Sequence, residues 1–502
     1  MAVQDFAAAA GHFREGHRQE AYDACTAILY REPETGDAWQ LSAIVRFQQG
    51  GDGMADAVAR QRRAVACDPA RADYAANLAA MMKARGDAGA AMVWLRRTAL
   101  LTPADPMPWR RLAAARQQAG DRAGAVDAFR DAAARHPLRS DLHAELGALA
   151  LQMDNGVTAV QAFRNALALV PGDAAALRNV GVAALHHGTA DASVGWLSRL
   201  LAVEPAHEDG FCDLALALHR RQIAHGGARW RHHDRRRFPP VPGRLRVYYR
   251  LSDRGNPKEK IAGPFACLAN FLDVFRPAAD ELRVIADNCR DDTVERVETM
   301  LAQAGCLHPA VIQRTALGHH GSFLHAKALA LADLSDLSDL SDCRHDRDAI
   351  VYFLEDDYLH LPGARAMLAE GLQIADYVTL YDHADKYTAP EATGLHGVIA
   401  AGGEETCVLR RPLSHWKFTA STTMTWACRL STLREDNAIW DRFRIERRSI
   451  DYCLHYTLGA AGRFLACPLP GHATHGEANW ASPGRDWPAL ARQTEQRMER
   501  RL

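Results

Sequence analysis

MPWRRLAAARQQAGDRAGAVDAFRDAAARHP, residues 107–137, contains the pattern that decides the fold of the first part of the chain. This stretch ends in a proline, and prolines recur before and after it with spacings of 36, 34, 34, 34 and 34 residues. A fixed period of this length is typical of a helical solenoid, in which each repeat buries its apolar face only against its neighbours. The prolines are Pro33, Pro69, Pro103, Pro137, Pro171 and Pro205.

Other positions repeat in phase with the prolines. Small residues occur at two places in each repeat, as at Ala113 and Ala125, and they allow two helices to approach closely. A large apolar residue, such as Phe129, follows the second small residue by four positions, which places both on one helix face. Glycine at the turn between the helices suits a left-handed helix end, and the fifth repeat has 154–156, Asp-Asn-Gly, instead. The turn glycines are Gly16, Gly50, Gly86, Gly120 and Gly188.

These features together resemble the tetratricopeptide repeat over about residues 3–208, with a capping helix expected near 208–221. We therefore assign residues 1–221 to a tetratricopeptide solenoid of about six repeats plus a capping helix. The resemblance implies a groove, lined by residues of the first helix of each repeat, that binds a partner. One register of that groove is a polar mixture that indicates no single mode of peptide-backbone capture: Asn77, Arg111, Glu145 and Asn179.

The bulk composition excludes several classes of function. A chain of 502 residues is longer than one hydrophobic core usually organises, so two domains are expected. A net charge of -1 gives no overall attraction to nucleic acid, and we expect no nucleic-acid partner. The 11 cysteines form no CxxC pair, which argues against a zinc module and against a disulfide framework. Because no stretch suits a signal peptide or a transmembrane segment, we predict a cytoplasmic protein.

The composition changes after the repeats. Residues 222–244 are rich in arginine and histidine and close on prolines, which predicts a basic, solvated linker. Residues 245–485 alternate short apolar runs with helical stretches, which indicates βαβ units and a mostly parallel, Rossmann-like sheet. Residues 486–502 are expected to form a C-terminal helix or tail, so the predicted fold class is α plus α/β, multidomain. The predicted strands are 245–251, 282–286, 311–313 and 349–354, and the predicted helices are 263–275, 293–304 and 322–331.

Two predicted strands end in acidic residues, at the edge where parallel sheets bind ligands. The first is followed by Asp287 and Asn288, and then by 291–292, two aspartates for which helix capping is an ordinary alternative. The second strand runs directly into 355–357, Glu-Asp-Asp. Adjacent carboxylates raise one another's pKa, so a divalent cation such as Mg²⁺ or Mn²⁺ is favoured over a structural turn.

Together with 321–329, GSFLHAKAL, these motifs resemble the nucleotide-sugar-binding core of GT-A fold glycosyltransferases, especially family-2-like enzymes, over roughly residues 245–480. The resemblance implies that Asp287, with Asn288 beside it, contacts the nucleobase of a nucleotide-sugar donor. It implies that Glu355 or Asp356 faces the ribose. It also implies that Asp357 holds a Mn²⁺ or Mg²⁺ ion that bridges the diphosphate of the donor.

The same resemblance implies two residues farther along the chain. An acidic residue at a helix start, Asp451, would act as the general base that removes a proton from the acceptor hydroxyl, with a plain N-cap as the alternative. A late histidine would be the third metal ligand, for which His475 is preferred to His472. The acceptor side is expected to include the polar residues that follow another predicted strand, namely Asp382, His383, Asp385 and Lys386.

These expectations describe a metal-dependent, inverting glycosyltransferase whose solenoid recruits a protein or glycan acceptor. Inversion follows from a single displacement at the sugar. A clear QxxRW-like element is missing near the expected base, which argues against a processive polysaccharide synthase. Two alternatives stay open. One is a non-catalytic interaction protein with a degenerate transferase-like domain, and the other is a metal-dependent phosphoesterase or nucleotidyltransferase.

Overall fold

The computed structural model describes residues 2–51, 53–224, 233, 236–253, 259–332, 348–387, 404, 406–442 and 451–500. It divides into two compact units, Met1–Gly188 and Thr189–Leu502. Among the helices of the described residues, none combines the length and the apolar character needed to cross a lipid bilayer.

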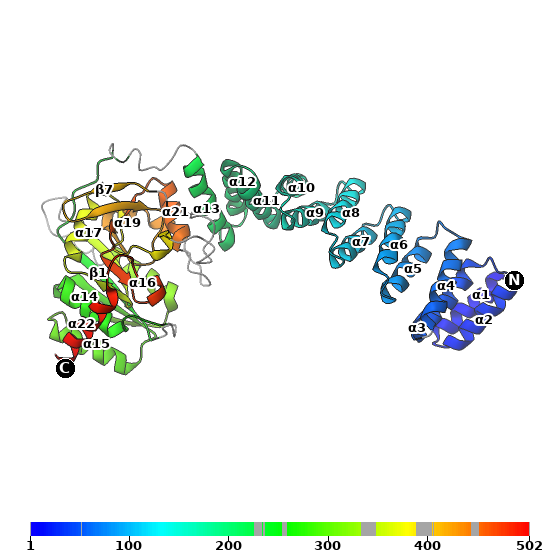
Figure 1. The fold of residues 1–502 in the computed structure, drawn as a ribbon, viewed down its shortest axis with the longest axis horizontal. Coiled ribbons are helices and arrows are strands. Elements are labelled where there is room, and N and C mark those ends of the chain that lie inside the picture. The colour runs from blue at the N-terminus through cyan, green and yellow to red at the C-terminus, as the bar shows by residue number, and fades with distance from the viewer. Residues whose placement is uncertain are drawn as a thin grey trace. The chain divides into compact units, whose positions relative to one another are not determined.

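The first unit is a tetratricopeptide-like helical solenoid, as the proline period predicts (Figure 1). Its helices pack in antiparallel pairs where small residues allow close approach. Gly147, for example, lies against the buried Phe163, and a Cβ atom at this position would come within 2.8 Å of the ring. The helices are α1 Ala2–Arg14, α2 Arg18–Arg31, α3 Gly36–Gln49, α4 Gly53–Cys67, α5 Ala72–Ala84, α6 Ala88–Leu101, α7 Met107–Gln118, α8 Arg122–Arg135, α9 Ser140–Gln152, α10 Gly156–Leu169 and α11 Ala174–His187.

The turns within the repeats have the predicted left-handed residue, with one exception. Four turn glycines have positive φ, and Asp154 takes this place in the fifth repeat with φ 60°. Gly188 does not, since its φ is -129°. There the chain leaves α11 through an extended backbone into Thr189, so the prediction for Gly188 is wrong. The four glycines are Gly16, Gly50, Gly86 and Gly120.

A second periodic feature follows three of these turns, those at Gly86, Gly120 and Asp154. Asp87, Asp121 and Asn155 are the N-cap residues of α6, α8 and α10, and they recur every 34 residues. Each side chain accepts a hydrogen bond from the backbone N–H three residues later, at distances of 2.8–3.2 Å. Each bond satisfies one of the N–H groups that the first turn of a helix leaves unpaired.

The last two helices of the repeat register, α12 Ala190–Val203 and α13 Glu208–Ala224, belong to the second unit. The expected capping helix is present as α13, but its apolar face packs into the core of the sheet domain and against α21 Asp451–Ala460. Phe211 is buried there, and His219 stacks on Tyr456 with ring centroids 4.2 Å apart. The boundary between compact units therefore falls before the expected position at residue 221.

The core of the second unit is a nine-stranded sheet with the order β3-β2-β1-β4-β9-β6-β10-β8-β7. Every strand and helix predicted between residues 245 and 354 is present, with ends that shift by a few residues. The strands are β1 Leu245–Leu251, β2 Leu282–Asp287, β3 Ile312–Thr315, β4 Ile350–Glu355, β6 Tyr377–Val378, β7 Val408–Arg410, β8 His415–Thr419, β9 Trp426–Arg429 and β10 Leu465–Leu469, and β5 Tyr358–His360 pairs with β11 Ala473–His475 in a small second sheet. The helices are α14 Pro264–Phe275, α15 Asp291–Gln303, α16 Gly318–Ala332, α17 Ala364–Leu372, α19 Leu430–Glu435, α20 Asn437–Asp441, α21 and α22 Trp487–Glu499.

The sheet is mixed, so the expectation of a mostly parallel sheet is wrong. Strands β3, β2, β1 and β4 form a parallel block, but β9 runs antiparallel to both β4 and β6. Beyond it, β8 pairs antiparallel with β10 and with β7. The second half of the sheet consists of strands as short as Tyr377–Val378, which are too short to show a period in the sequence.

Both faces of the sheet are covered, which explains why β1 is buried along its whole length. Val247 and Tyr249 point into a core that α14 and α17 cover, and Tyr248 between them points into the core beneath α16 and α21. Figure 1 shows these helices around the strands of the second unit.

The segment expected to be a solvated linker packs on this unit in its described part. Arg236 forms an ion pair of 2.7 Å with the buried Asp376, and Phe238 packs against the core. The carbonyl group of Pro239 accepts a hydrogen bond of 2.6 Å from Arg429. The prediction of a solvated segment is wrong for this part, because Arg236 pairs with a buried acid and Phe238 packs against the apolar core. The expected C-terminal helix is α22, whose Trp487 is buried.

Candidate functional site

The acidic residues after β2 and β4 lie at one edge of the sheet. Both strands pair in parallel with β1, so their carboxyl ends point the same way. Asp287 is the last residue of β2 and Glu355 is the last residue of β4. The structure therefore brings together the two acidic motifs that the sequence analysis selected.

The charge of Glu355 is compensated from within the fold. Arg250 of β1, which is 5% exposed, donates a hydrogen bond of 2.5 Å to the Glu355 carboxylate. The same guanidinium also donates to the backbone carbonyl of His319 at 2.7 Å, which ties β1 to α16. Glu355 thus forms a buried ion pair that links three elements of the parallel block.

Asp356 and Asp357 lie next to each other with little exposure to solvent. Asp356 accepts a hydrogen bond of 2.9 Å from the N–H of Ser252, but burial and the adjacent Asp357 raise its pKa to about 7. Burial also raises the pKa of Asp357, although His475 and Lys260 oppose that shift. The Asp357 carboxylate is 3.4 Å from Nε2 of His475 and 3.8 Å from Nζ of Lys260.

The three carboxylates therefore face cations that the chain itself supplies. Arg250 and Lys260 carry two fixed positive charges against three acids, which leaves one negative charge when all three acids are ionised and His475 is neutral. Because Arg250 and Lys260 neutralise much of its charge, this acidic run needs an added cation less than the sequence alone suggests. A cation bound here would still neutralise the remaining negative charge of the three acids, and it would lower the raised pKa of Asp356.

Of the two late histidines, the structure places His475 beside Asp357. His472 turns away and contacts the backbone carbonyl of Pro362 through its Nε2 atom at 2.9 Å. His475 lies on β11 opposite Tyr358 of β5, and its Nδ1 accepts a hydrogen bond of 3.1 Å from the N–H of Glu477. A neutral imidazole with this contact carries its proton on Nε2, the atom that faces Asp357.

Asp287 is engaged by the protein rather than open to a ligand. Its carboxylate accepts hydrogen bonds from Thr315 Oγ1, the N–H groups of Leu317 and Gly318, and the Asn288 amide, at 2.6–3.0 Å. Burial works to raise the pKa of Asp287, but these four bonds hold it below the usual value. A carboxylate offers about four lone-pair positions, and all are filled. Asp287 thus fixes the turn between β3 and α16 and has no acceptor position left for a nucleobase in this arrangement.

Asn288 supports the same turn. It adopts a left-handed conformation with φ 56°, which asparagine tolerates better than most residues. Its N–H donates to the carbonyl of Thr315 at 2.8 Å. The predicted Asp451 is the first residue of α21, as expected for an acid at a helix start, but its side chain lies outside the described residues.

The polar residues expected on the acceptor side belong to a network that lies near His475. The ring of Tyr381 lies 6.3 Å from the His475 ring and 5.0 Å from the His383 ring, between centroids. His383 Nδ1 is 2.7 Å from a carboxylate oxygen of Asp385. Burial works to raise the pKa of Asp385, but its bond to His383 and the nearby Lys386 lower it.

The same network contains a buried ion pair between Asp382 and Lys417. The Lys417 ammonium is 2.6 Å from Asp382, and both side chains are almost fully buried. Tyr387 donates a further hydrogen bond to Asp382 at 2.6 Å. No local pattern indicates this pair, because Asp382 follows β6 in a loop whereas Lys417 lies on β8. Arg250, in contrast, is visible in the sequence, since an arginine in a largely apolar strand predicts a buried partner.

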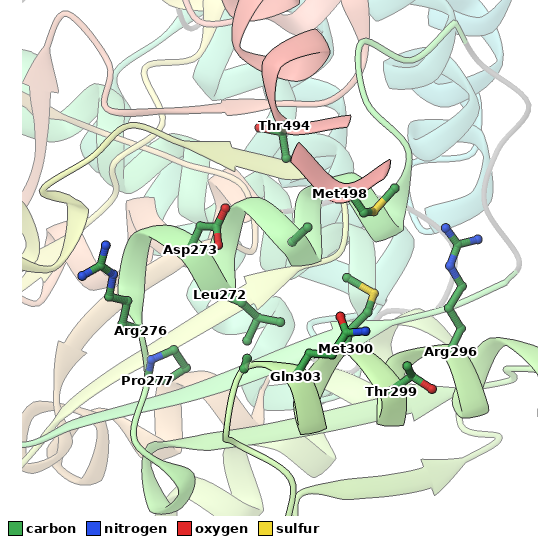
Figure 2. Close-up of a pocket in the computed structure, with 12 residues that line it drawn as sticks. Leu272, Asp273, Arg276, Pro277, Arg296, Thr299, Met300, Gln303, Thr494 and Met498 are labelled. Atoms are coloured by element: carbon green, nitrogen blue, oxygen red, sulfur yellow. The ribbon is translucent and has the colours of Figure 1, made fainter. Parts of the chain in front are cut away.

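A cavity of about 430 Å³ lies on the same unit but contains none of the predicted site residues. Figure 2 shows side chains from α14, α15 and α22 around it, including Asp273, Arg296 and Met498. Its lining comes from the carboxyl-terminal halves of α14 and α15, which lead into the first residues of β2 and β3. The cavity therefore lies toward the end of the parallel strands opposite to the acidic edge.

No family model and no curated protein match this chain. Among solved structures, one of the MamA protein is 19% identical, covers 35% of this chain and 96% of its own, and has a TM-score of 0.27. YrrB, described as a TPR protein with an unusual peptide-binding site, is 14% identical, covers 38% of this chain and 96% of its own, and has a TM-score of 0.28. PilF of Pseudomonas aeruginosa is 17% identical, covers 42% of this chain and 94% of its own, and has a TM-score of 0.26.

Proposed function

We propose that the second unit is a divalent-cation-dependent glycosyltransferase that transfers a sugar from a nucleotide-sugar donor to a protein or glycan acceptor recruited by the solenoid. The observation that carries the proposal is the position of Asp357. It lies at the carboxyl end of β4, beside the raised-pKa carboxyl of Asp356, with His475 brought to 3.4 Å from a distant part of the chain. Parallel sheets bind ligands at this edge.

For Mg²⁺ or Mn²⁺, the carboxylates at this edge are more suitable ligands than the imidazole of His475. Hard cations take oxygen ligands and commonly complete their coordination with phosphate oxygens, so Asp357 would suffice as a main protein ligand. The His475 Nε2 atom carries a proton in the observed contact, which suits a hydrogen-bond donor that orients Asp357 rather than a direct ligand. A cation bound here would supply positive charge against the departing nucleoside diphosphate.

Transfer with inversion also needs a group that takes the proton of the acceptor hydroxyl. In the single displacement, the acceptor oxygen bonds to the anomeric carbon, the bond from that carbon to the diphosphate oxygen breaks, and the proton moves to the base. Asp451 remains one candidate for the base. Among the described residues, His383 is a second. Its Nδ1 faces both the Asp385 carboxylate at 2.7 Å and the Asp385 N–H at 3.2 Å, and a proton on Nδ1 toward the carboxylate would leave Nε2 to accept one.

The proposal is tested by titrating a panel of nucleotide sugars into the full chain with Mn²⁺ or Mg²⁺ and measuring binding by calorimetry. We expect Asp357→Asn to weaken metal-dependent binding of the donor by about tenfold to a hundredfold. Asp291→Asn is the matched control, because Asp291 is an exposed acid after β2 that pairs with Arg314. A folded protein that binds no nucleotide sugar with either metal would exclude a transferase.

A second candidate function is a non-catalytic interaction protein, and two observations favour it. The filled hydrogen-bond positions of Asp287 and the Arg250–Glu355 ion pair turn expected ligand contacts into structural ones. Product analysis separates the remaining classes. A transferase releases a nucleoside diphosphate, whereas a phosphoesterase or a nucleotidyltransferase releases phosphate or pyrophosphate, and an interaction protein releases none of these.

A further inference from the structure

The turn between α1 and α2 of the solenoid gathers three side chains that can bind a metal. One ligand atom from each of His12, Glu15 and His17 lies within 4.8 Å of the others. Within the described part of the chain, this is the place where three such groups come that close. The cluster belongs to the first unit and is independent of the acidic edge of the sheet.

The backbone fixes the positions from which these side chains project. The N–H of His17 donates to the carbonyl of His12 at 2.9 Å, and the N–H of Glu15 donates to Gly11 at 3.0 Å. Gly16 makes the turn with φ 84°, a conformation that suits glycine. Because the turn is closed by hydrogen bonds, bringing the three groups onto one ion requires side-chain rotation and no rearrangement of the backbone.

One distance in the cluster is close to that expected in a tetrahedral site. A Glu15 carboxylate oxygen lies 3.7 Å from Nδ1 of His17. Two ligands of a tetrahedral zinc ion with bonds near 2.0–2.1 Å are about 3.3 Å apart, so a small adjustment suffices. The His12 ring lies nearby, with its centroid 6.3 Å from that of His17.

His12 provides a second, independent observation, because one of its ring nitrogens lacks a hydrogen-bond partner. Its Nδ1 atom is shielded from solvent and has no hydrogen-bond partner among the described residues. Shielded polar atoms are usually satisfied, because leaving one without a partner costs free energy. A metal ion held by the cluster would give the His12 imidazole a partner.

We propose that His12, Glu15 and His17 form a zinc-binding site at the turn between α1 and α2 of the solenoid. Two imidazoles and one carboxylate suit Zn²⁺, whose fourth position would be filled by water, whereas Mg²⁺ and Ca²⁺ prefer oxygen ligands throughout. Among the described residues, the repeat formed by α1 and α2 packs against α3 of the next repeat. An ion that ties the end of α1 to the start of α2 stabilises that repeat in proportion to its occupancy.

The test is a titration of the full chain with Zn²⁺ alone, followed by hydrogen exchange and mass spectrometry. Zn²⁺ is expected to slow amide exchange in α1 and α2, and a chelator should reverse the effect. His12→Ala and His17→Asn should each raise the Zn²⁺ concentration needed for this protection by about tenfold or more. Glu15→Gln should weaken it as well, whereas Glu20→Gln, an exposed acid of α2 outside the cluster, should leave it unchanged.

Two results would overturn the proposal. One is that Zn²⁺ gives no added protection to α1 and α2 of the wild-type chain. The other is that His17→Asn retains the full protection. Because exchange is read separately for each segment, Zn²⁺ bound at Asp357 would appear in peptides of the second unit. Failure of the zinc site and failure of the proposed transferase are therefore distinguishable.

Discussion

Buried polar side chains find their partners close by in the sequence in the first unit and far away in the second. In the solenoid, Ser42, Gln61 and Thr98 are bonded to carbonyl groups 3, 13 and 4 residues away. In the sheet unit, the partners of Arg250 and Lys327 are Glu355 and Asp441, which are 105 and 114 residues away. The solenoid therefore satisfies its buried groups through local geometry, whereas the sheet unit must complete its fold before such charges are paired.

The distance in sequence between a buried polar group and its partner indicates which substitutions destabilise each unit most. A buried charge whose distant partner is removed has no local substitute, and its desolvation cost remains. A polar group bonded to the backbone of its own turn keeps most of its surroundings when a neighbouring repeat changes. Substitutions at distant pairs should therefore reduce stability more than substitutions at local caps. The loss of stability from a distant pair should be confined to the second unit.

The largest effect is expected from Lys417→Met. This change leaves the Asp382 carboxylate, which is 1% exposed, without its ammonium partner at 2.6 Å. We expect the free energy of unfolding of the second unit to fall by about 3 to 5 kcal/mol. Urea denaturation followed by segment-resolved hydrogen exchange measures each unit separately. The double variant Lys417→Met, Asp382→Asn should recover a large part of the loss, and a loss that is the same in both variants would contradict the charge argument.

A smaller, pH-dependent effect is expected at His360, which has no exposed surface and contacts the hydroxyl of Tyr352 at 2.8 Å. Burial lowers the pKa of His360 from 6.5 to about 3. The unfolded chain therefore binds the proton more readily, so stability is full above pH 6.5 and is lost as the pH falls toward 3. At pH 5 the second unit should have lost about 2 kcal/mol relative to pH 7 through this group.

The check is thermal unfolding at pH 7 and at pH 5 for the wild type and for His360→Gln. Glutamine keeps a hydrogen-bonding group near Tyr352 but does not titrate, so the variant should lose less stability on acidification. His415→Gln, at an exposed position of β8, is the control and should retain the dependence of the wild type. Equal acid sensitivity in both variants would show that other groups control this range.

The extent to which sequence predicted the structure follows the same division. The 34-residue period indicated the solenoid, because every repeat presents the same local pattern and packs on its neighbour. In the sheet unit, the pattern located the strands through β4 and the acids at their ends. The roles of those acids depend on residues that no local pattern connects to them, such as Ser252, Lys260 and the four donors around Asp287. Of the short strands after α17, the sequence indicated β6 before Asp382. The others were missed for a related reason, since a strand is defined there by its partners.

The smallest effect is expected at a local cap. Asp121→Ala removes the bond of 2.8 Å to the Gly124 N–H at the start of α8, which should destabilise this repeat by about 1 kcal/mol. Asp127→Ala, an exposed position on the same helix, should change stability by less than about 0.5 kcal/mol. In segment-resolved exchange, we expect faster opening in α7 to α10, whose helices lie in or next to the altered repeat, and unchanged rates in the second unit. If protection fell equally in both units, the solenoid would be coupled to the sheet as one cooperative body, and the contrast between local and distant partners would not describe how this chain loses its structure.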